Sequence, residues 1–393
     1  MHKLIQSSIL VTAGSLLLAA AALSDDRAEK SQREALARRL VTDSARVHEG
    51  ELVQLSGCPE DIPLLEDLAV AVRRQGAHPL ITLGSDRLSR RLFDEVPTRF
   101  DSQPAASDLK LAGTIDARIQ TEFADDDALA GVAADRVEAV GRGNREVYAL
   151  LRKRKVRLVW LGNGLYPTAA RARQAKLSQN DLRQLFQAGL AADRAAMHAT
   201  GERLKGAFAA GKTVRLTSPR GTDLSFGIAA RPLTVSDGVA DNRPGEAPPW
   251  TWLPAGEVFF VPVAGSAEGK VVLNQYLFEG KTIEALSLTI RAGKLVALQA
   301  KSGGEPLQAA YKAAEPGKEL VSSIDLGINP NVRLPTACLL QTNVPAGMVT
   351  VGLGNNTWAG GDVKIPFALP LYIGDGTLTV DGRVIVEKGA LKR

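Results

Sequence analysis

The sequence predicts an α/β protein with two parts, and three observations lead to this fold class. Helical and strand-like patterns alternate over residues 32–204, which indicates an N-terminal α/β domain with a mostly parallel sheet. Residues 205–393 read mainly as short strands between glycine-containing turns, which indicates a C-terminal β-rich α+β domain. A chain of 393 residues is also long for a single domain.

In the first part, helix and strand signals follow one another closely. A helical pattern beginning near Glu34 ends at Gly50, and a later one has Pro63 in its first turn and Gly76 at its end. The apolar runs between and after them predict strands, and a long helix or helix pair precedes the second part. The predicted strands are 51–57, 78–84 and one in 155–164, and the final helical stretch is 178–211.

In the second part, turn signals such as "AGK", "GDG" and "VDGR" divide the apolar segments. Strands are expected within 212–218, 222–229, 256–263, 269–278, 283–300 and 376–389. The stretch "EPLQAAYKAA" and the region of Leu320 are expected to supply at most one or two helices.

Composition excludes several classes of protein. With 45% hydrophobic and 23% charged residues, the chain is neither disordered nor a polytopic membrane protein. The formal charge is +5, and no basic stripe interleaved with aromatic residues occurs in the sequence. We therefore expect no nucleic-acid partner.

The N-terminus carries an export signal. Lys3 precedes the uncharged stretch of residues 4–23, which ends in small residues before Asp25 and Asp26. Residues 1–24 are therefore predicted to be a signal peptide or, since the stretch just reaches spanning length, a membrane anchor. Either way, the folded part is expected to be exported to a periplasmic or extracellular location, with membrane contact only through residues 4–23 if they stay uncleaved.

The cysteines and histidines do not by themselves indicate a metal site. Cys58 and Cys338 are the only cysteines, so they form either one disulfide or two free thiols, and they exclude a thiolate cluster. The chain has four histidines, none with a second histidine at a ligand-type spacing, so each is expected to be structural or exposed.

One nucleotide-binding motif is expected to be accidental. The stretch "GAFAAGKT", residues 206–213, matches the phosphate-binding loop G-x-x-x-x-G-K-[ST]. That loop needs a strand before it and a helix after it, whereas here a helical pattern precedes it and a strand pattern follows. We therefore read Gly211 as a helix stop.

Several stretches resemble one family, the aminopeptidase T family of metallo-aminopeptidases. They cover nearly everything after residue 35 and occur in the family's order. They are "GELVQLSG" followed by "GAHP", then "VWLGNGLYPTAARARQAKLS", "WLPAGEVFFVPVAGSAEG", "IDLGINPN", "GMVTVGLGNNTWAGGD" and "TLTVDGRVIVEKG". The resemblance implies two divalent metals of zinc or cobalt type in the C-terminal domain. Paired metals supply hydroxide and stabilise the oxyanion when an N-terminal residue is cut from a peptide.

The resemblance carries only two of the five metal ligands onto this sequence. The two family glutamates fall on Glu257 and on the shorter Asp325. The two histidines fall on Thr350 and Ala368, and the final aspartate falls on Pro370. A tyrosine near the reaction centre falls on Thr357. None of these side chains has the imidazole, carboxylate or phenol of the family residue. Glu257 and Asp325 are therefore the candidate metal ligands, and the sequence leaves open whether this chain holds a metal.

Each of these residues also has an ordinary structural interpretation. Asp362 and Asn356 offer further oxygens, and a carboxylate-rich set would favour Mg²⁺ or Ca²⁺ over zinc. Glu257 could instead be an edge residue or an ion-pair partner. Asp325, in the turn-rich stretch "DLGINPN", could be a helix cap or turn residue.

Three hypotheses for function follow. The first is an exported aminopeptidase with an altered metal centre, in which Glu257, Asp325 and Asp362 would converge. The second, which the missing imidazoles favour, is a non-catalytic relative that binds peptide N-termini or a small ligand, or acts as a dimeric scaffold. The third is a metal-dependent oxygenase, which also requires histidines. The resemblance further implies a homodimer.

Overall fold

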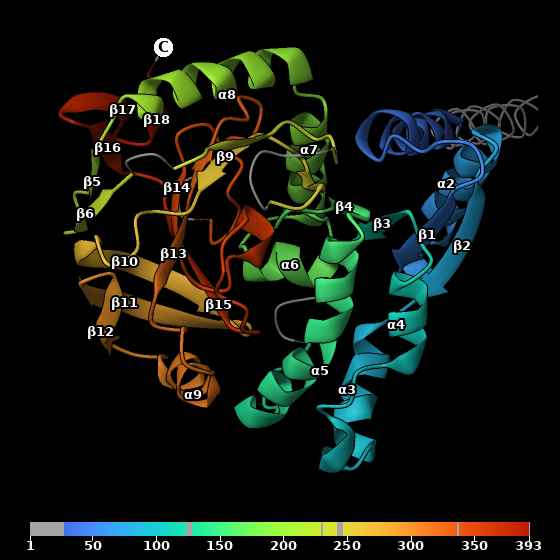
Figure 1. Ribbon diagram of the computed structural model, residues 1–393, viewed down its shortest axis with the longest axis horizontal. Helices are drawn as coiled ribbons and strands as arrows, with labels where there is room; N and C mark the ends of the chain where they lie inside the picture. Colours follow the sequence, from blue (N-terminus) through green and yellow to red (C-terminus); the bar gives the residue numbers. More distant parts are fainter. Residues whose placement is uncertain (1–26, 123–127, 229–230, 242–246, 336–337, 393) are drawn as a thin grey trace, which may run out of the picture.

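We describe a computed structural model of the chain, which covers residues 27–122, 128–228, 231–241, 247–335 and 338–392 (Figure 1). The predicted signal peptide or anchor at residues 1–24 lies outside these ranges. None of the helices within them is both long and apolar enough to cross a membrane.

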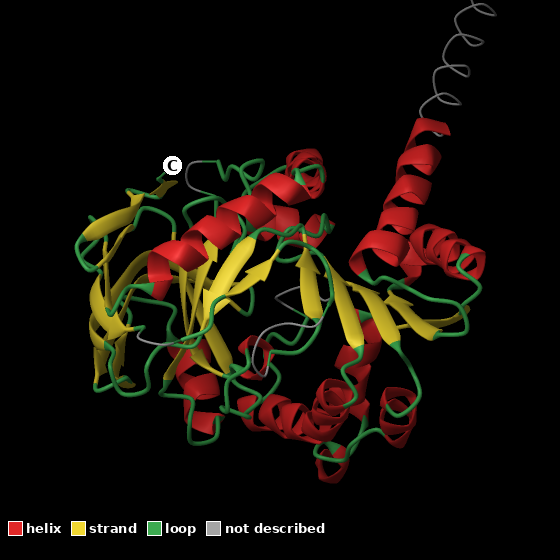
Figure 2. Ribbon diagram, turned by 45° about the horizontal axis from the view of Figure 1, so that its top comes forward, coloured by secondary structure: helices red, strands yellow, loops and turns green. Residues whose placement is uncertain are grey.

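The N-terminal part is built on a five-stranded parallel sheet, which confirms the predicted α/β fold class. The strand order is β2 (His78–Leu83), β1 (Leu52–Gly57), β3 (Ala117–Thr121), β4 (Arg157–Leu161) and β8 (Trp250–Leu253). Helices lie on both sides of the sheet (Figure 2). They are the helix of residues 27–39, α2 (Ile62–Arg74), α3 (Asp86–Glu95), α4 (Ala106–Ala112) and α5 (Ala134–Lys153).

The edge strand β8 comes from the second half of the sequence. Trp250–Leu253 pairs in parallel with Leu158–Leu161 of β4, so the chain returns to the first sheet after leaving it. The predicted boundary between residues 204 and 205 lies inside α8 (Arg194–Ala209), which follows α6 (Ala169–Gln174) and α7 (Gln179–Leu190). The boundary stays a prediction. One strand that follows it in the sequence, β8, belongs to the N-terminal sheet.

The C-terminal part contains two antiparallel sheets and α9 (Glu305–Ala313). The larger sheet has the order β12 (Lys294–Gln299), β11 (Lys281–Arg291), β10 (Glu268–Phe278), β6 (Asp223–Gly227), β5 (Thr213–Thr217), β16 (Thr377–Val380), β17 (Arg383–Glu387) and β18 (Ala390–Leu391). The smaller one, which we call the site sheet, has the order β15 (Ala368–Ile373), β14 (Val349–Gly354), β13 (Val321–Gly327), β9 (Glu257–Phe260) and β7 (Thr234–Ser236).

The stretch "EPLQAAYKAA" supplies one helix, α9, which is within the expected limit of one or two. The region of Leu320 adds none: Leu320 makes an isolated bridge with Lys294, and a strand begins at Val321. The structural interpretation of Asp325 as a helix cap or turn residue was wrong. Asp325 lies within this strand and is neither a helix cap nor a turn residue. All seven residues of β13 are buried, so the strand lacks the alternation of polar and apolar residues that identifies a half-buried strand in a sequence.

The nucleotide-binding motif has no structural basis. Helix α8 runs to Ala209, and β5 begins at Thr213, so the loop precedes a strand. Gly211 lies closely against β16, since a Cβ there would stand 2.4 Å from Val380 Cγ1. This confirms the reading of residues 206–213 as the end of a helix.

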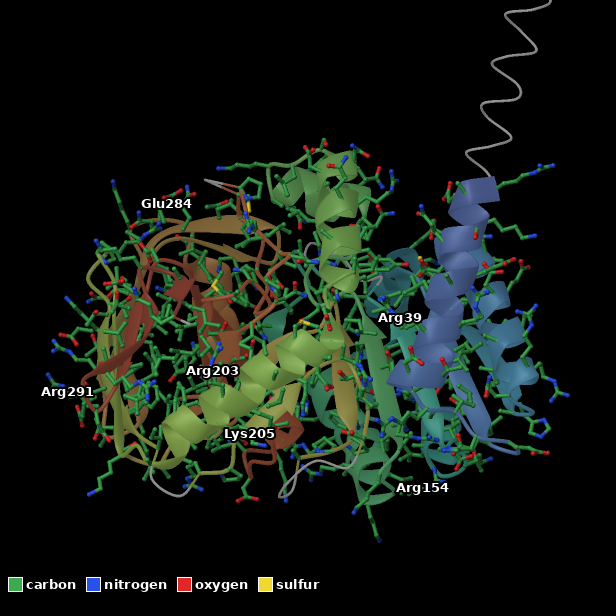
Figure 3. All side chains as sticks on the ribbon, turned by 90° about the horizontal axis from the view of Figure 1, so that it is seen from above. Arg39, Arg154, Arg203, Lys205, Glu284 and Arg291 are labelled. Carbon is green, nitrogen blue, oxygen red and sulfur yellow. The ribbon has the colours of Figure 1, made fainter. Side chains whose placement is uncertain are left out.

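Charged side chains project from widely separated parts of the molecule. In Figure 3, Arg39 and Arg154 belong to the N-terminal part, Arg203 and Lys205 to α8, and Arg291 to β11. Both cysteines are free.

A buried carboxylate joins the ends of three elements in the N-terminal part. Asp61 is 7% exposed, and its Oδ2 accepts hydrogen bonds from the amide of Cys58 (3.0 Å), the thiol of Cys58 (3.2 Å) and Thr121 Oγ1 (2.5 Å). The hydroxyl of Tyr166 donates to Oδ1. Burial and the adjacent carboxylates raise the pKa of the Cys58 thiol to about 12, so this thiol acts as a donor.

We predict that Asp61→Asn lowers the free energy of unfolding by about 3 kcal/mol, because an amide turns a donor toward groups that are themselves donors. The measurement is urea unfolding at neutral pH. The matched control is Asp94→Asn, since Asp94 pairs with Arg90 on an exposed helix face and its loss is expected to cost less than about 1 kcal/mol. Equal losses in the free energy of unfolding of the two variants would contradict the hydrogen-bonding role assigned to Asp61.

Candidate functional site

The candidate site lies on one face of the site sheet. Asp325 is opposite Thr350 on β14, which in turn is opposite Tyr372 on β15. Asp325 is also opposite Phe259 on β9, two residues from Glu257. Because residues directly opposite one another, or two apart along a strand, share a face, Glu257, Asp325, Thr350 and Tyr372 lie on the same side of the sheet.

The other two positions of missing family ligands lie on this face too. Ala368 is opposite Gly354 and Pro370 is opposite Gly352, so both alternate in step with Tyr372. The positions of both absent histidines and of the absent aspartate therefore share a face with Glu257 and Asp325. This agrees with the register that the resemblance implies.

Both carboxylates are buried, and an asparagine amide covers each. Glu257 is 2% exposed and accepts a hydrogen bond from Asn163 Nδ2. Asp325 is 3% exposed, and its Oδ2 accepts from Asn343 Nδ2 at 3.0 Å. Thr350 Oγ1 donates to Asn343 Oδ1 at 3.2 Å, which fixes the amide with its nitrogen toward Asp325.

Two glycines allow these asparagines to reach the carboxylates. Gly164 has φ +77°, and a Cβ there would stand 2.2 Å from the carbonyl oxygen of Gln341. A Cβ at Gly327 would stand 2.2 Å from the carbonyl oxygen of Asn343. The loop carrying Asn163 and the segment carrying Asn343 can approach this closely only because these two positions lack a side chain.

Burial shifts the ionisation of Asp325. Removal from water, and secondarily the negative charge of Glu257, raise the pKa of the Asp325 carboxyl well above its ordinary value. Its Oδ1 is buried and has no hydrogen-bond partner among the described residues. Both effects therefore shift the equilibrium toward the protonated carboxyl at this position.

The residues present do not fit the two-metal centre of the resembling family. Glu257 and Asp325 are directed at N–H donors, which do not ligate a cation. Asp362 is exposed and does not join them: the described residues contain no group of three or more His, Cys, Asp or Glu that could hold a metal ion. A zinc site ordinarily needs about three protein ligands per ion, and here the imidazole positions carry Thr350 and Ala368.

The remaining sequence candidates have structural roles. Asn356 Nδ2 donates to the carbonyl of Ser322, and its Oδ1 accepts from the amide of Val363, so it braces the loop after β14. Thr357 begins a short 3-10 turn, Thr357–Ala359. His198 Nδ1 lies 3.1 Å from Asp237 Oδ2 at an exposed position.

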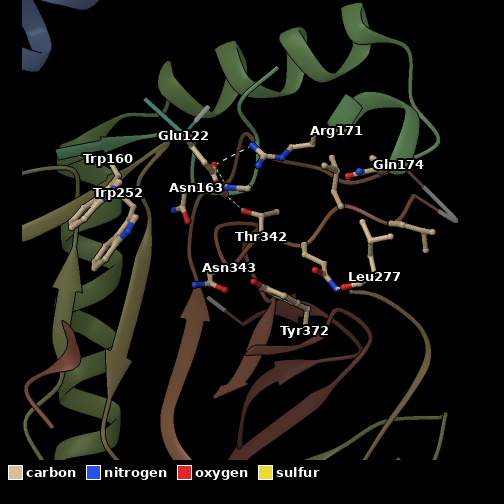
Figure 4. A pocket seen from close by; sticks show the side chains of 15 residues that line it. Glu122, Trp160, Asn163, Arg171, Gln174, Trp252, Leu277, Thr342, Asn343 and Tyr372 are labelled. Atoms are coloured by element: carbon tan, nitrogen blue, oxygen red, sulfur yellow. Dashed lines mark hydrogen bonds and ion pairs between the residues drawn. The ribbon is translucent and has the colours of Figure 1, made fainter. Parts of the chain in front are cut away.

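A polar cavity of about 290 Å³ adjoins the two asparagines (Figure 4). Asn163 and Asn343 line it, so their amides stand between the cavity and the carboxylates. Across the cavity, Arg171 Nη1 lies 3.2 Å from Glu122 Oε2, which also accepts from the amide of Gly164. We call this space the polar cavity.

The walls of the polar cavity offer both charges and unpaired amide atoms. Arg171 is 5% exposed, in α6 directly after the Thr168 cap. Gln174, one turn later, has a buried amide whose oxygen and nitrogen have no partner among the described residues. The hydroxyl of Thr342 donates to the carbonyl of Asn163 at 2.8 Å and ties the two sides together.

Sequence reasoning missed most of this cavity. Glu122 follows the end of β3 and matches no motif. Asn163, Arg171 and Gln174 lie inside the quoted stretch "VWLGNGLYPTAARARQAKLS" of the resemblance, but no role was assigned to them. A signal was present, since polar residues after β3 and β4 meet at the carboxyl edge of a parallel sheet, where ligands bind.

Comparisons with known proteins agree with this architecture. A family model described as thermophilic metalloprotease (M29) matches residues 29–321. Wild-type AmpT from Thermus thermophilus superimposes with a TM-score of 0.73 at 20% identity, over 93% of this chain and 100% of that chain. A 2,5-dihydroxypyridine dioxygenase from Pseudomonas putida KT2440 has a TM-score of 0.57 at 15% identity, over 92% and 97%. No curated protein matched. At these identities the two structures show the fold alone.

The ionisation of Asp325 leads to a pH prediction. An unfolded aspartate ionises near its ordinary pKa, whereas the folded one holds its proton to higher pH. The stabilisation is complete below the ordinary pKa and is lost as pH rises toward the folded-state value, by up to about 1.4 kcal/mol per pH unit. Asp325→Asn, whose side chain cannot ionise, should remove this loss of stability with rising pH.

We therefore expect that, between about pH 5 and about pH 8, wild type loses stability relative to Asp325→Asn. Urea unfolding across this range measures the difference. Asp362→Asn, at an exposed loop position, is the control and should keep the wild-type slope. Parallel profiles for wild type and Asp325→Asn would contradict the assigned protonation.

Proposed function

Because the chain belongs to the thermophilic metalloprotease family (M29), we propose that it is a member whose metal centre is degenerate and which binds a small zwitterion, a free amino acid or a short peptide, without cleaving it. One observation carries the proposal: amide N–H groups cover both remaining carboxylates, and the other ligand positions hold Thr350, Ala368 and Pro370. In the family, the metal supplies hydroxide and stabilises an oxyanion. Among the described residues, no group of ligands that could hold such a metal is present.

The polar cavity supports the zwitterion as the ligand class. Arg171 presents a guanidinium that suits a carboxylate, and Glu122, beside it, presents a carboxylate that suits an ammonium group. A volume of about 290 Å³ admits a ligand of this size and excludes a folded partner.

A catalytic aminopeptidase or oxygenase is less well supported. Both would need imidazole ligands near Glu257, and the described histidines lie elsewhere, with Glu51, Arg73 and Asp237 as neighbours. The dioxygenase of similar fold is matched at only 15% identity, so it is no evidence for an oxygenase activity of this chain.

The first test asks whether the centre binds metal. We predict that the purified protein holds less than a stoichiometric amount of zinc, cobalt or manganese by elemental analysis and does not hydrolyse aminoacyl amides with any of them added. The combined variant Thr350→His, Ala368→His, Pro370→Asp should raise zinc affinity by about 10-fold or more, because ligand number sets affinity. Thr350→Ala, Ala368→Ser, Pro370→Ala is the matched control. Tightly bound metal with chelator-sensitive turnover in wild type would overturn the proposal.

The second test concerns the ligand. We predict saturable binding of alanyl-alanine in titration calorimetry, with Arg171→Lys weakening it by about 10-fold because a two-pronged contact is lost. Lys176→Gln, at an exposed position just after α6, should leave the affinity unchanged. Equal effects of the two substitutions, or no binding, would contradict the assignment of this cavity.

We further propose that the folded part is exported and forms a homodimer, as the N-terminal stretch and the family resemblance imply. Mass spectrometry of the N-terminus after cell fractionation should find either a chain starting near residue 25 in the exported fraction or an uncleaved chain in the membrane fraction. An intact chain in the cytosolic fraction would contradict export. Light scattering on the purified protein tests the dimer.

A further inference from the structure

A second cavity gathers all the tryptophans of the chain. The sequence contains four, Trp160, Trp250, Trp252 and Trp358, and each of them lines the same space of about 350 Å³. They come from β4, from β8 and from the turn after β14, which lie far apart in the sequence. We call this space the tryptophan cavity.

The rings form one continuous apolar wall. Tyr148 of α5 packs edge-on against Trp250 at 6.2 Å, and Trp250 packs edge-on against Trp160 at 5.6 Å. Trp160 stacks on Trp252 at 5.4 Å with only 7° between the planes, and Trp252 meets Trp358 edge-on at 5.7 Å. Flat rings at these spacings favour a flat aromatic guest, which can stack or pack edge-to-face in the same way.

The tryptophan cavity is separate from the polar cavity. The two share only the stacked pair Trp160 and Trp252, which stands between them as a wall. Glu122 and Arg171 line the polar cavity alone. A ligand in the tryptophan cavity would therefore be recognised by different groups.

The charges around the tryptophan cavity have one sign. Its lining residues include Arg145, Arg152 and Lys364 and, among the described residues that line it, no aspartate or glutamate. Arg145 is already paired with Glu315 of the C-terminal part at 2.5 Å, so Arg152 and Lys364 supply the remaining positive charge. A guest with a negative group is favoured over a neutral or cationic one.

We propose that the tryptophan cavity binds a small aromatic carboxylate. The aromatic body would lie against the tryptophan wall, and the carboxylate would be held by Arg152 and Lys364. The volume of about 350 Å³ matches a ligand of one or two rings and lies at the small end of ligand pockets.

Intrinsic fluorescence tests this directly, because every tryptophan in the protein lines the cavity. The probe is phenylacetate, and its neutral counterpart phenylacetamide is the matched ligand. Excitation at the red edge of the indole band avoids absorption by both. Phenylacetate should give a saturable change with at least about 10-fold higher affinity than phenylacetamide, as expected for one charge-assisted contact.

Substitutions locate the binding. Arg152→Gln and Lys364→Gln should each weaken phenylacetate about 5-fold or more and leave phenylacetamide unchanged. Lys153→Gln, the exposed neighbour of Arg152 on the same helix, is the control and should have no effect. Near-ultraviolet circular dichroism verifies that each variant is folded.

The proposal is overturned if phenylacetate gives no saturable change, if acid and amide bind equally, or if Lys153→Gln acts like Arg152→Gln. Its failure is independent of the proposed function, because alanyl-alanine binding in the polar cavity should be the same in wild type and Arg152→Gln.

Discussion

The contact between Asn163 and Glu257 is the constraint on which the site depends. Asn163 follows β4 of the parallel sheet, and Glu257 begins β9 of the site sheet, so this hydrogen bond joins the two parts of the molecule at the point where a catalytic centre would lie. Asn163 Nδ2 also donates to the carbonyl of Pro254, which holds the amide in place. A buried carboxylate needs such donors, because an unpaired charge in this environment is strongly unfavourable.

The same need explains the second asparagine. Among the described residues no basic side chain pairs with Asp325, and its neighbour Glu257 is another carboxyl group, so the raised pKa of Asp325 and the amide of Asn343 are what make its burial tolerable. A dinuclear metal centre would neutralise such a pair of carboxylates by its own charge. In the proposed degenerate centre, the two asparagine amides would take that part.

The return of the chain to the parallel sheet shapes both cavities. By adding β8 beside β4, it places Trp252 directly opposite Trp160 and creates the stacked pair that divides the polar cavity from the tryptophan cavity. Cross-strand aromatic pairs of this kind also stabilise the sheet edge they occupy. The same two residues therefore separate the two cavities and form part of the edge of the sheet.

The sequence by itself determined the alternation of helices and strands before α8, the antiparallel strands after it and the family, because periodicity, turn residues and quoted motifs are local properties of the chain. It also predicted Glu257 and Asp325 as the candidate ligands that remain, which stays a prediction. Only the tertiary structure decided that Asp325 lies inside a fully buried strand, that Asn163 and Asn343 cover the carboxylates, and that four tryptophans meet in one cavity. The contact between Asn163 and Glu257 joins residues 94 positions apart, and that between Trp252 and Trp358 joins residues still further apart, so no local pattern encodes which distant groups will meet.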